Sequence, residues 1–461
     1  MLSDLAGADV TTPAVVLKFD PNVMHHGGLG AIRSLGRLGV PVYGVHEGPW
    51  APAANSRYLQ GRVFWQPTPE HTERIQAGLM QLARRIGRPS VLITTDDAGA
   101  IFLAEHGDSL RESFLFPAPP AGLPRQLAGK YSMFQLCCER GVPSPHAAVP
   151  ASLGAARDFA NLTGFPVIAK LTTPWTHGDA RRGAALPSTS IMHTARELDE
   201  AYRACARENA GLMLQEYIPG GPGRDWFFHG YCGRDSVSRP AFTGVKDRSY
   251  PARAGLTSLG HSALNAPLRD QVTGLLSDLS YRGITDLDLR FDQRDGQYKL
   301  LDFNPRLGAQ FRLFQDEAGL DVVRAAYLDL TGQAIASHQV VDGRRFLVEN
   351  YDPIAALGYW RSGELGLKSW IASLRGIDEA AWFARDDLRP FGLMCLRMSW
   401  RMVSRPFARG PAGPSRDNKP RYRRGRAAAR AGSTARSPQP TTSSLAAQHP
   451  EPAIHTRGEK I

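Results

Sequence analysis

The sequence predicts an α/β protein that begins with a parallel α/β domain and continues into a region rich in β-strands. Three observations support this: a strand–loop–helix–strand pattern near the N-terminus, a strand–helix pair near residue 90, and a hairpin signal near residue 290. The chain has 461 residues, enough for two or three domains. We expect an N-terminal domain over 1–120, a central domain over 121–335, a helical appendage over 336–404 and a tail over 405–461.

The composition is that of an ordinary globular protein. Hydrophobic residues make up 42% of the chain, and no apolar run approaches the ~20 residues of a membrane-spanning helix. The first residues contain no basic segment followed by an apolar core, so we expect no secretory signal. The five cysteines are scattered and lack metal-binding spacing, which predicts reduced thiols and a cytoplasmic protein.

The N-terminal domain is predicted from a β-loop-α-β unit. Ala14–Phe19 has strand character, a glycine-rich loop and a helix through Leu38 follow it, and Val42–Val45 is the next strand. Ser90–Thr95 is another apolar run typical of a strand, and a helix through Ala104 follows it. Strands that alternate with helices in this way favour a parallel sheet.

The glycine-rich loop at 27–30 has two interpretations. His25, His26 and the glycines could hold a phosphate at the N-terminus of the following helix. Their spacing is not the dinucleotide-binding fingerprint, however, and the nearest acidic residue, Glu47, lies beyond the end of the next strand. We favour a tight turn.

Two lysines mark a candidate phosphate site. Lys130 lies on a helix predicted over Gln126–Gly141, after a proline-rich linker at Pro117–Arg125. Lys170 ends a strand and precedes Thr172–Ser188, a loop with glycines and paired arginines. A lysine before such a loop suits a phosphate site under a lid. Each lysine by itself is also typical of a solvated surface charge.

The apolar run Leu212–Ile218 is a candidate nucleotide contact. Its backbone could pass beside an adenine ring, and Glu216 or Asp225 could then reach the ribose. A buried strand followed by a surface turn explains the same residues. Strand patterns at Phe227–Gly230 and Ala241–Lys246 continue one antiparallel sheet.

An amphipathic helix at Asn265–Tyr281 leads into the most informative segment, Gly283–Arg306. The runs Thr285–Phe291 and Gln297–Phe303 flank the turn signal Arg294-Asp295-Gly296 and predict a β-hairpin. Alternation places the following residues of the first run on one face: Asp286, Asp288, Arg290 and Asp292. The same rule predicts a shared face for these residues of the second run: Tyr298, Leu300, Asp302 and Asn304.

The turn decides whether the hairpin carboxylates meet. A three-residue loop with Gly296 in the left-handed conformation pairs Gln293 with Gln297 and sets Asp288 opposite Asp302. A two-residue turn would send the two carboxylates to opposite faces. We expect the three-residue loop because it gathers the oxygen-bearing side chains.

Those side chains form a candidate metal site. Facing carboxylates repel unless a cation lies between them, and hard oxygen ligands suit Mg²⁺, with Mn²⁺ as an alternative ion. Asp288, Asp302 and Asn304 would supply the ligands, and Arg306 follows as a neighbouring cation. A polar hairpin face in water is the other interpretation. The apolar residues at the spacer positions exclude a calcium-binding loop.

The last third of the chain divides in two. Phe346–Trp400 contains enough aromatic and apolar residues for a small helical appendage. From Arg405 onward, twelve Lys and Arg stand against three acidic residues, so this tail carries +9 of the formal net charge of +11. Its composition predicts disorder. The basic run Lys419–Arg430 could contact an anionic membrane or nucleic acid, although we favour a solvated tail.

Taken in order, these motifs resemble the ATP-grasp superfamily, and within it the carboxylate–amine ligases of the D-aspartate-ligase type. The likeness covers roughly residues 120–335, and the N-terminal α/β unit agrees with the superfamily's first domain. The motifs that carry it are Lys130 ahead of Gly141-Val142-Pro143, Lys170 after a Pro-Val strand, Gln215-Glu216-Tyr217-Ile218-Pro219-Gly220, and Asp302-Phe303-Asn304-Pro305-Arg306. Each motif is short, but the ordered set is specific.

The resemblance implies an ATP-grasp fold in which two β-rich lobes clamp Mg-ATP. It places Lys130 and Lys170 on the phosphates and the metal on Asp288, Asp302 and Asn304. The residues that it implies for the nucleoside are Gln215, Glu216, Tyr217, Ile218 and Asp225. This chain has Asp at two metal positions where such enzymes usually carry Glu, which puts affinity and metal geometry in doubt.

The implied activity is amide formation between a small-molecule carboxylate and an amine, an amino acid among them, through an acyl phosphate, with release of ADP and phosphate. We expect Arg306 beside the transferred phosphoryl group, Arg290 on the acyl-phosphate oxygens, and Lys246 or Arg248 on a substrate carboxylate. The alternative is a non-catalytic nucleotide-binding protein that its basic tail localises to membrane or nucleic acid.

Overall fold

The computed structural model describes residues 7–66, 71–172, 186, 189–252 and 255–404. Most of the loop predicted at Thr172–Ser188 and all of the tail predicted at 405–461 lie outside the described residues. Within the described ranges, no helix combines the length and hydropathy needed to cross a membrane. The domain boundaries stay predictions.

The N-terminal region contains a five-stranded parallel sheet in the order β3-β2-β1-β4-β5. Its strands are β1 (Ala14–Leu17), β2 (Val42–His46), β3 (Leu59–Phe64), β4 (Ser90–Thr94) and β5 (Phe114–Leu115). Its helices are α1 (Gly27–Leu38), α2 (Thr72–Ile86) and α3 (Asp97–His106). The predicted parallel α/β architecture is confirmed.

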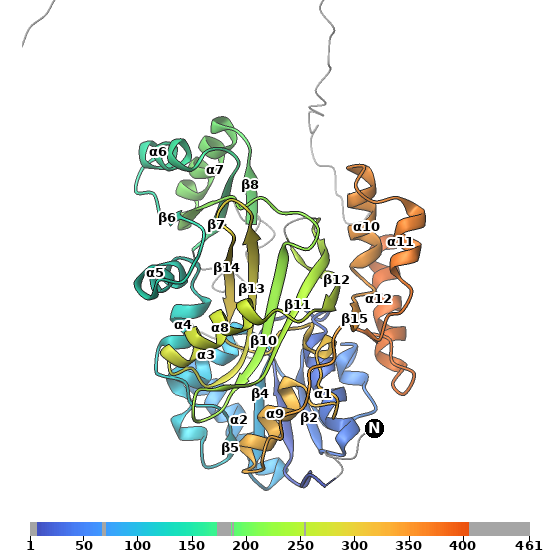
Figure 1. Ribbon diagram of the computed structural model, residues 1–461. Helices are drawn as coiled ribbons and strands as arrows, with labels where there is room; N and C mark the ends of the chain where they lie inside the picture. Colours follow the sequence, from blue (N-terminus) through green and yellow to red (C-terminus); the bar gives the residue numbers. More distant parts are fainter. Residues whose placement is uncertain (1–6, 67–70, 173–185, 187–188, 253–254, 405–461) are drawn as a thin grey trace, which may run out of the picture. The chain divides into compact units, whose positions relative to one another are not determined.

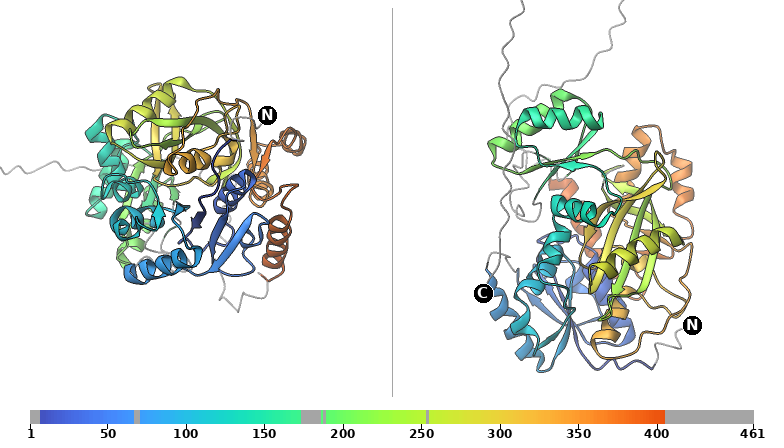
Figure 2. Two further views of the ribbon diagram at one scale, coloured as in Figure 1. Left: turned by 90° about the horizontal axis from the view of Figure 1, so that it is seen from below. Right: turned by 60° about the vertical axis from the view of Figure 1, so that its left-hand side comes forward.

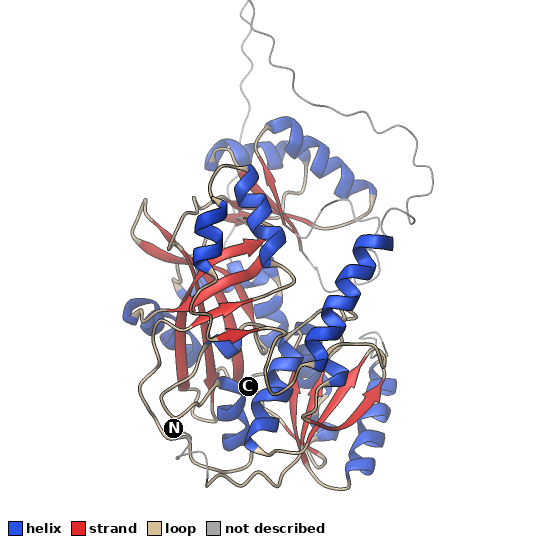
Figure 3. Ribbon diagram, turned by 90° about the vertical axis from the view of Figure 1, so that its right-hand side faces the viewer, coloured by secondary structure: helices blue, strands red, loops and turns tan. Residues whose placement is uncertain are grey.

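Helices cover both faces of this sheet, as Figure 3 shows. Ala14 and Val16 of β1 pack in one apolar cluster with α1, whereas Val15 and Leu17 pack in another with α2 and α3. Successive strand residues point to opposite faces, so each face has its own core. A sheet buried on both faces needs the continuous apolar runs that the sequence shows.

A four-stranded sheet in the order β6-β9-β7-β8 forms a small lobe. Its elements are β6 (Ala147–Ala148), α6 (Leu153–Thr163), β7 (Val167–Leu171), β8 (Thr189–Met192), α7 (Ala195–Arg207) and β9 (Leu212–Glu216). Val167, Ala169 and Leu214 pack against α6 and α7, which cover one face of the sheet (Figure 2). Lys170 therefore points to the face that these helices leave uncovered.

The helix predicted at Gln126–Gly141 is in fact two helices, α4 (Leu123–Ala128) and α5 (Lys130–Arg140). They are separated at Gly129, whose ψ of 122° is extended. The Ser132 hydroxyl donates to the carbonyls of Gln126 and Gly129, which stabilises the break. Lys130 is consequently the first residue of α5 rather than a mid-helix residue.

A seven-stranded sheet in the order β14-β13-β10-β11-β12-β15-β16 forms the central scaffold. Its strands are β10 (Asp225–Cys232), β11 (Ser238–Tyr250), β12 (Leu256–Ser262), β13 (Gly283–Asp292), β14 (Gln297–Asn304), β15 (Arg345–Leu347) and β16 (Glu379–Ala380). All neighbouring strands pair antiparallel except β15 and β16. Helix α8 (Ala266–Asp278) packs with α4 and α5 on one face, and it is yellow in Figure 2.

The predicted hairpin is present, but its loop length differs from the prediction, and a bulge in β14 restores the expected pairing of the carboxylates. Asp288 does pair with Asp302, as expected. The predicted loop is wrong, because Asp292, not Gln293, pairs with Gln297. A β-bulge between the Asp288 and Leu289 pairs places one extra residue, Leu301, in β14 and corrects the register.

The bulge also changes which residues share a face. Leu300 pairs with Leu289 and packs with Phe303 in the apolar core, whereas Asp302 lies on the opposite, polar face. The prediction that Tyr298 and Leu300 share a face with Asp302 is therefore wrong. The extra residue allows both strands to keep apolar side chains on one face and charged side chains on the other.

The C-terminal region is only partly helical. It contains α9 (Val322–Leu330), α10 (Asp352–Arg361), α11 (Leu367–Ser373) and α12 (Arg389–Ser404), and the last three lie together in Figure 1. It also supplies β15 and β16 to the central sheet. Among its tryptophans, Trp382 is fully buried in the core, whereas Trp360 and Trp400 are exposed.

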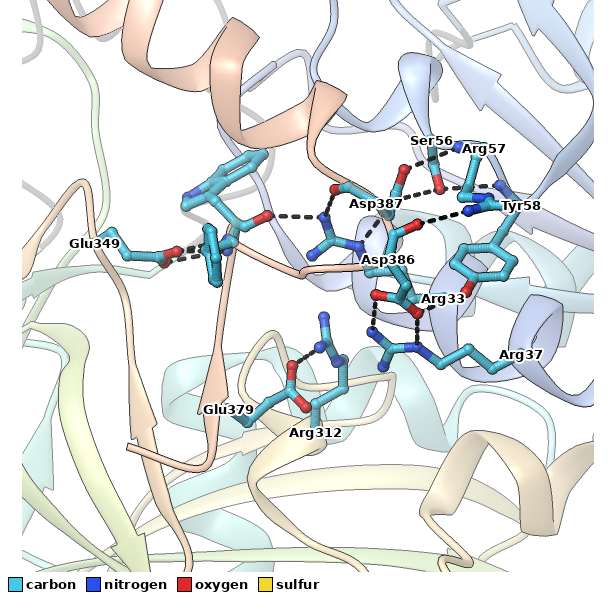
Figure 4. A network of polar contacts seen from close by, with 12 residues as sticks. Arg33, Arg37, Ser56, Arg57, Tyr58, Arg312, Glu349, Glu379, Asp386 and Asp387 are labelled. Atoms are coloured by element: carbon cyan, nitrogen blue, oxygen red, sulfur yellow. Dashed lines mark hydrogen bonds and ion pairs between the residues drawn. The ribbon is translucent and has the colours of Figure 1, made fainter. Parts of the chain in front are cut away.

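A buried ion pair between Arg33 of α1 and Asp387 connects this region to α1 (Figure 4). Asp387 accepts from Arg33 Nε at 2.9 Å, from the Ser56 hydroxyl at 2.7 Å and from the Arg57 N–H at 2.9 Å. Arg33 also donates to the Trp382 carbonyl at 2.8 Å. The side chains of Arg33 and Asp387 are 0% and 1% exposed. Removing either one would leave the other as an uncompensated buried charge, which strongly destabilises a fold.

We predict that Asp387→Ala destabilises the protein by about 3–5 kcal/mol, because it leaves the Arg33 guanidinium buried without a counter-charge. Asp386→Ala is the matched control, since Asp386 pairs with Arg37 at half-exposed positions and should cost about 1 kcal/mol or less. Guanidinium unfolding followed by tryptophan fluorescence measures both. Equal losses would contradict this account of the contact between α1 and the C-terminal region.

Candidate active site

The candidate site is a polar face formed by β10, β11, β13 and β14. Asp288 of β13 lies opposite Asp302 of β14, and on the next rung Asp286 lies opposite Asn304. Directly opposed side chains in an antiparallel pair stand about 5 Å apart. Asp288 and Asp302 remain 30% and 27% exposed, so a ligand can reach them.

Each opposed carboxylate has a lysine from another element. Lys130, at the start of α5, is ion-paired with Asp302, and Lys246 Nζ of β11 lies 3.1 Å from Asp288. Desolvation raises the pKa of Asp302, but Lys130 and Lys170 outweigh it and leave the pKa below its usual value. Desolvation lowers the pKa of Lys246, but nearby carboxylates, Asp288 foremost, outweigh this effect and leave the pKa above its usual value. Asp302 is thus held ionised by the neighbouring lysines.

Lys170 is the third lysine of the site. It ends β7 and projects from the uncovered face of the small lobe toward the charges of Asp302 and Lys130. Desolvation lowers its pKa to about 8, and Lys130 contributes to the shift, while Asp302 opposes it. A lysine near its titration point responds strongly to an anionic ligand.

The predicted nucleoside contacts lie where β9 ends. Gln215 is buried, and the Glu216 carboxylate accepts from Arg294 at the hairpin tip at 2.6 Å. Tyr217 follows β9 and is half-buried, and Ile218 is buried. The Glu216 side chain therefore contacts the large sheet in this structure, and a role on the ribose stays a prediction.

Arg290 joins this connection to the central sheet. It donates to Asp225 at 2.5 Å and to the Ile218 carbonyl at 2.9 Å. The pairing of β10 with β13 places Asp225 and Arg290 directly opposite each other. Arg290 thus fixes the segment that follows β9, and its predicted contact with an acyl phosphate stays untested.

Arg306 follows the hairpin and contacts three acidic or amide side chains. It donates to Asp286 at 3.0 Å and to the Asn304 side-chain oxygen at 2.9 Å, and its Nε lies 3.3 Å from Asp97. Asp97 begins α3, so Arg306 links the N-terminal region to the central sheet. The predicted position of Arg306 beside the hairpin carboxylates agrees with these contacts.

Sequence reasoning missed one buried polar residue near Arg306, His229, which lies beside Asp286. Asp286 is 5% exposed, His229 of β10 is fully buried, and His229 Nε2 lies 3.2 Å from Asp286 Oδ1. Burial raises the pKa of Asp286, Arg306 opposes the shift, and Asp288 adds to it. Burial, then Arg306, lowers the pKa of His229 to about 3, so its imidazole is neutral. Alternation had placed Asp286 on the correct face, but nothing marked His229.

Arg248 lies away from the hairpin carboxylates, and its predicted role in substrate binding stays untested. It forms a buried ion pair with Asp352 of α10, with Nε and Oδ1 2.8 Å apart, and it donates to the Ser373 hydroxyl at 2.8 Å. A bulge at Asp247 separates Arg248 from Lys246 in β11. Only Lys246 of the two thus faces Asp288.

The candidate metal ligands were tested by their donor chemistry. Within the described ranges, no group of three or more His, Cys, Asp or Glu side chains is arranged to hold a metal ion. Asp288 and Asp302 supply two carboxylates and Asn304 an amide oxygen one rung away. Mg²⁺ typically takes one or two carboxylates and completes its shell with substrate phosphates and water, so this donor set fits.

The comparisons with known proteins agree with this geometry. No protein-family model matches the sequence. A D-aspartate ligase from Enterococcus faecium is 24% identical over 249 residues, which cover 51% of this chain and 57% of that protein. The matched segment thus spans little more than half of the relative's length.

Solved structures resemble the chain more broadly. An N5-carboxyaminoimidazole synthetase from Staphylococcus aureus matches with a TM-score of 0.53 and 11% identity, covering 73% of this chain and 81% of that one. The biotin carboxylase domain of Hydrogenobacter thermophilus 2-oxoglutarate carboxylase, solved with MgADP, matches with a TM-score of 0.53 and 14% identity over 73% and 74%. A carboxyaminoimidazole ribonucleotide synthase from Aspergillus clavatus, solved with ATP, matches with a TM-score of 0.52 and 12% identity. The match covers 72% of this chain and 80% of that one.

These likenesses show the fold. The chain has the ATP-grasp fold, and the predicted resemblance to the ATP-grasp carboxylate–amine ligases is confirmed. Over about half of the chain, its sequence is similar to that of a D-aspartate ligase.

We predict that ATP affinity falls above about pH 8, because Lys170 then loses the positive charge that we expect to attract the phosphates. The pKa of Lys170 is lowered from 10.5 to about 8, so the charge is present below pH 8 and is lost as the pH rises. The affinity for a non-hydrolysable ATP analogue with Mg²⁺ should fall up to about tenfold per pH unit. Calorimetric titration between pH 6.5 and 9.5 measures it.

Lys170→Arg is the matched control, because a guanidinium keeps its charge throughout this range. The variant should bind the analogue with little pH dependence. A wild-type affinity that stays constant to pH 9.5 would show that Lys170 does not contact the phosphates.

Proposed function

We propose that this protein is an ATP-dependent carboxylate–amine ligase. The observation that supports this most strongly is that two opposed carboxylates each have a lysine partner and that two further cations lie near them. Lys130, Lys170 and Lys246 come from three separate elements, and Arg306 follows the hairpin. A reaction that transfers a phosphoryl group needs cations on several sides of the transferred oxygens.

Lys130 and Lys170 bind the ATP phosphates. Lys130 is ion-paired with Asp302, and Lys170 lies close enough to lower the pKa of the same carboxyl group, so both cations are near the position proposed for the phosphates. The backbone of Gln215–Ile218 contacts the adenine, and Asp225 contacts the ribose. Arg290 holds Asp225 and the Ile218 carbonyl in place for that contact.

Asp288, Asp302 and Asn304 hold Mg²⁺, or Mn²⁺ as an alternative ion. When bound there, this ion would offset the negative charge that develops on the phosphate oxygens. The chain's own residues supply the remaining charge. Lys246 lies 3.1 Å from Asp288 and is placed to bind the carboxylate that is to be activated.

The reaction proceeds in two steps. A carboxylate oxygen of the acid attacks the terminal phosphorus of ATP, the bond to ADP breaks, and an acyl phosphate forms. The amine nitrogen then attacks the acyl carbon, and the carbon–oxygen bond to phosphate breaks. Arg306 is placed to stabilise the acyl-phosphate oxygens in both steps because it lies beside Asn304.

The substrates are a small carboxylic acid and an amine. The name of the Enterococcus faecium relative makes D-aspartate the first acid to test. All five cysteines are free thiols, which supports a reducing, cytoplasmic site of action. The basic run at Lys419–Arg430 has the charge to contact anionic lipid or nucleic acid.

We predict that the purified protein releases ADP and phosphate only when Mg-ATP, an acid and an amine are all present. D-Aspartate with a pool of amino acids is the first combination, followed by a panel of other carboxylic acids. Asp302→Asn should lower kcat by about 10²-fold or more because it weakens both metal and lysine contacts. Coupled ADP detection and mass spectrometry of the condensed product measure the outcome.

Asp295→Asn is the matched control, because it makes the same change of charge in the same hairpin but at its exposed tip. It should turn over like the wild type. ATP binding without ADP release for any acid would contradict the ligase and favour a non-catalytic nucleotide-binding protein.

A further inference from the structure

Helix α12 turns an uncharged and partly apolar face outward. Leu396 and Trp400 are 62% and 70% exposed, and residues four positions apart are neighbours on a helix surface. An outward helix face ordinarily carries charged and polar side chains, so this face is unusual. The exposed residues between positions 392 and 400 are Gly392, Cys395, Leu396, Ser399 and Trp400.

The opposite face of α12 holds the helix in place. Met394 is buried in the apolar cluster that also contains residues of α1, and Phe391 and Met398 pack against the same cluster. The packing of the helix therefore uses a different set of apolar side chains. Leu396 and Trp400 are exposed, so the fold does not account for their being apolar.

Arginines flank the uncharged face. Arg389 and Arg401 are exposed, and Arg397 donates to the Trp50 carbonyl at 3.1 Å. The Trp50 side chain, 68% exposed, adds a further aromatic group beside the helix. The sequence from Leu388 to Ser404 contains these three arginines and no acidic residue.

The charge of the chain is concentrated in and after this helix. From Leu388 to the last residue, fifteen Lys and Arg stand against three acidic residues, a formal charge of +12. The preceding 387 residues contain 40 Lys and Arg against 41 Asp and Glu and are nearly neutral. The positive charge thus directly adjoins the exposed leucine and tryptophan in the sequence.

These features match one kind of partner better than two others. Leucine and tryptophan between arginines are typical of helices that lie in the interface of an anionic membrane. A second copy that used the same face would bring arginines together, with no acidic residue in the helix to offset them. Nucleic acid would attract the arginines but would give the aliphatic Leu396 no apolar surroundings.

We propose that the outward face of α12 binds the surface of a membrane that contains anionic phospholipid. Leu396 and Trp400 enter the headgroup region, and the arginines beside them contact lipid phosphates. The basic residues from 405 onward add to the attraction through their charge. This surface is an addition to the proposed function, and the inference does not depend on the ligase reaction.

The interaction requires two contributions. Two apolar side chains bury little area, and the attraction between basic residues and lipid is screened by salt. Peripheral binding becomes stable when apolar contact and charge act together. We therefore expect binding to need anionic lipid, to weaken as the salt concentration rises, and to depend on Leu396 and Trp400.

Sedimentation of the full-length protein with vesicles tests this. The wild type should bind vesicles of phosphatidylcholine with phosphatidylglycerol and should bind phosphatidylcholine alone much more weakly. The double variant Leu396→Ser/Trp400→Ser should bind the anionic vesicles about 10- to 100-fold more weakly, because two apolar side chains no longer leave water. Leu162→Ser is the matched control, because it makes the same change at an 85% exposed position of α6, and it should bind like the wild type.

Quenching of tryptophan fluorescence by brominated phospholipids gives a second readout that does not depend on the double variant. Bromine on the acyl chains quenches only tryptophans that enter the bilayer. The wild type should be quenched by anionic brominated vesicles. Trp400→Phe keeps an aromatic side chain and should still bind, but it should lose much of that quenching.

The outcomes decide between the three partners. No binding of the wild type to anionic vesicles, or equal binding by the wild type and the double variant, would overturn the inference. Equal quenching of the wild type and Trp400→Phe would overturn it as well, because Trp400 would then stay outside the bilayer. Light scattering that shows a dimer of the wild type and a monomer of the double variant, both without lipid, would assign the face to a second copy instead.

Discussion

Two carboxylates that face each other across neighbouring strands, Asp288 and Asp302, impose the condition that the surrounding elements satisfy. At this spacing the like charges repel, and the cations that offset the repulsion come from α5 and β11, with a third from β7 nearby. The small lobe and the large sheet are thus connected through charge as well as through the chain. We infer that the lysines shift from carboxylates to phosphates when a nucleotide and its metal ion bind.

The hairpin illustrates how far alternation predicts a strand pair. It predicted the opposition of Asp288 and Asp302 and the face of Asp286. It did not predict the bulge at Leu301, because an extra residue in one strand leaves only a small break in the alternation of apolar and polar positions. Two consecutive leucines at 300 and 301 were the one available signal, since strict alternation would separate them.

The fold was predictable because its signals are local, whereas much of the site depends on contacts between distant segments. Parallel strands, the hairpin and the ordered lysine motifs can be recognised in windows of a few residues. The contact between Asp97 and Arg306 joins residues more than two hundred positions apart. Arg248 was predicted to bind a substrate carboxylate because its actual partner, Asp352, is also too distant in the sequence for a local pattern to reveal the pair. Charged residues in a sequence do not reveal whether they neutralise each other inside the fold, as Arg33 and Asp387 do.

The measurement that tests the central claim most directly is the binding of Mn²⁺, followed by its electron paramagnetic resonance signal, in the presence of a non-hydrolysable ATP analogue. If Asp288 and Asp302 hold the metal ion of the nucleotide complex, the wild type should bind Mn²⁺ with the analogue, and Asp288→Asn should weaken that binding about tenfold or more. Binding that is equal in the two proteins would contradict the account, because the opposed carboxylates would then serve only to anchor lysines.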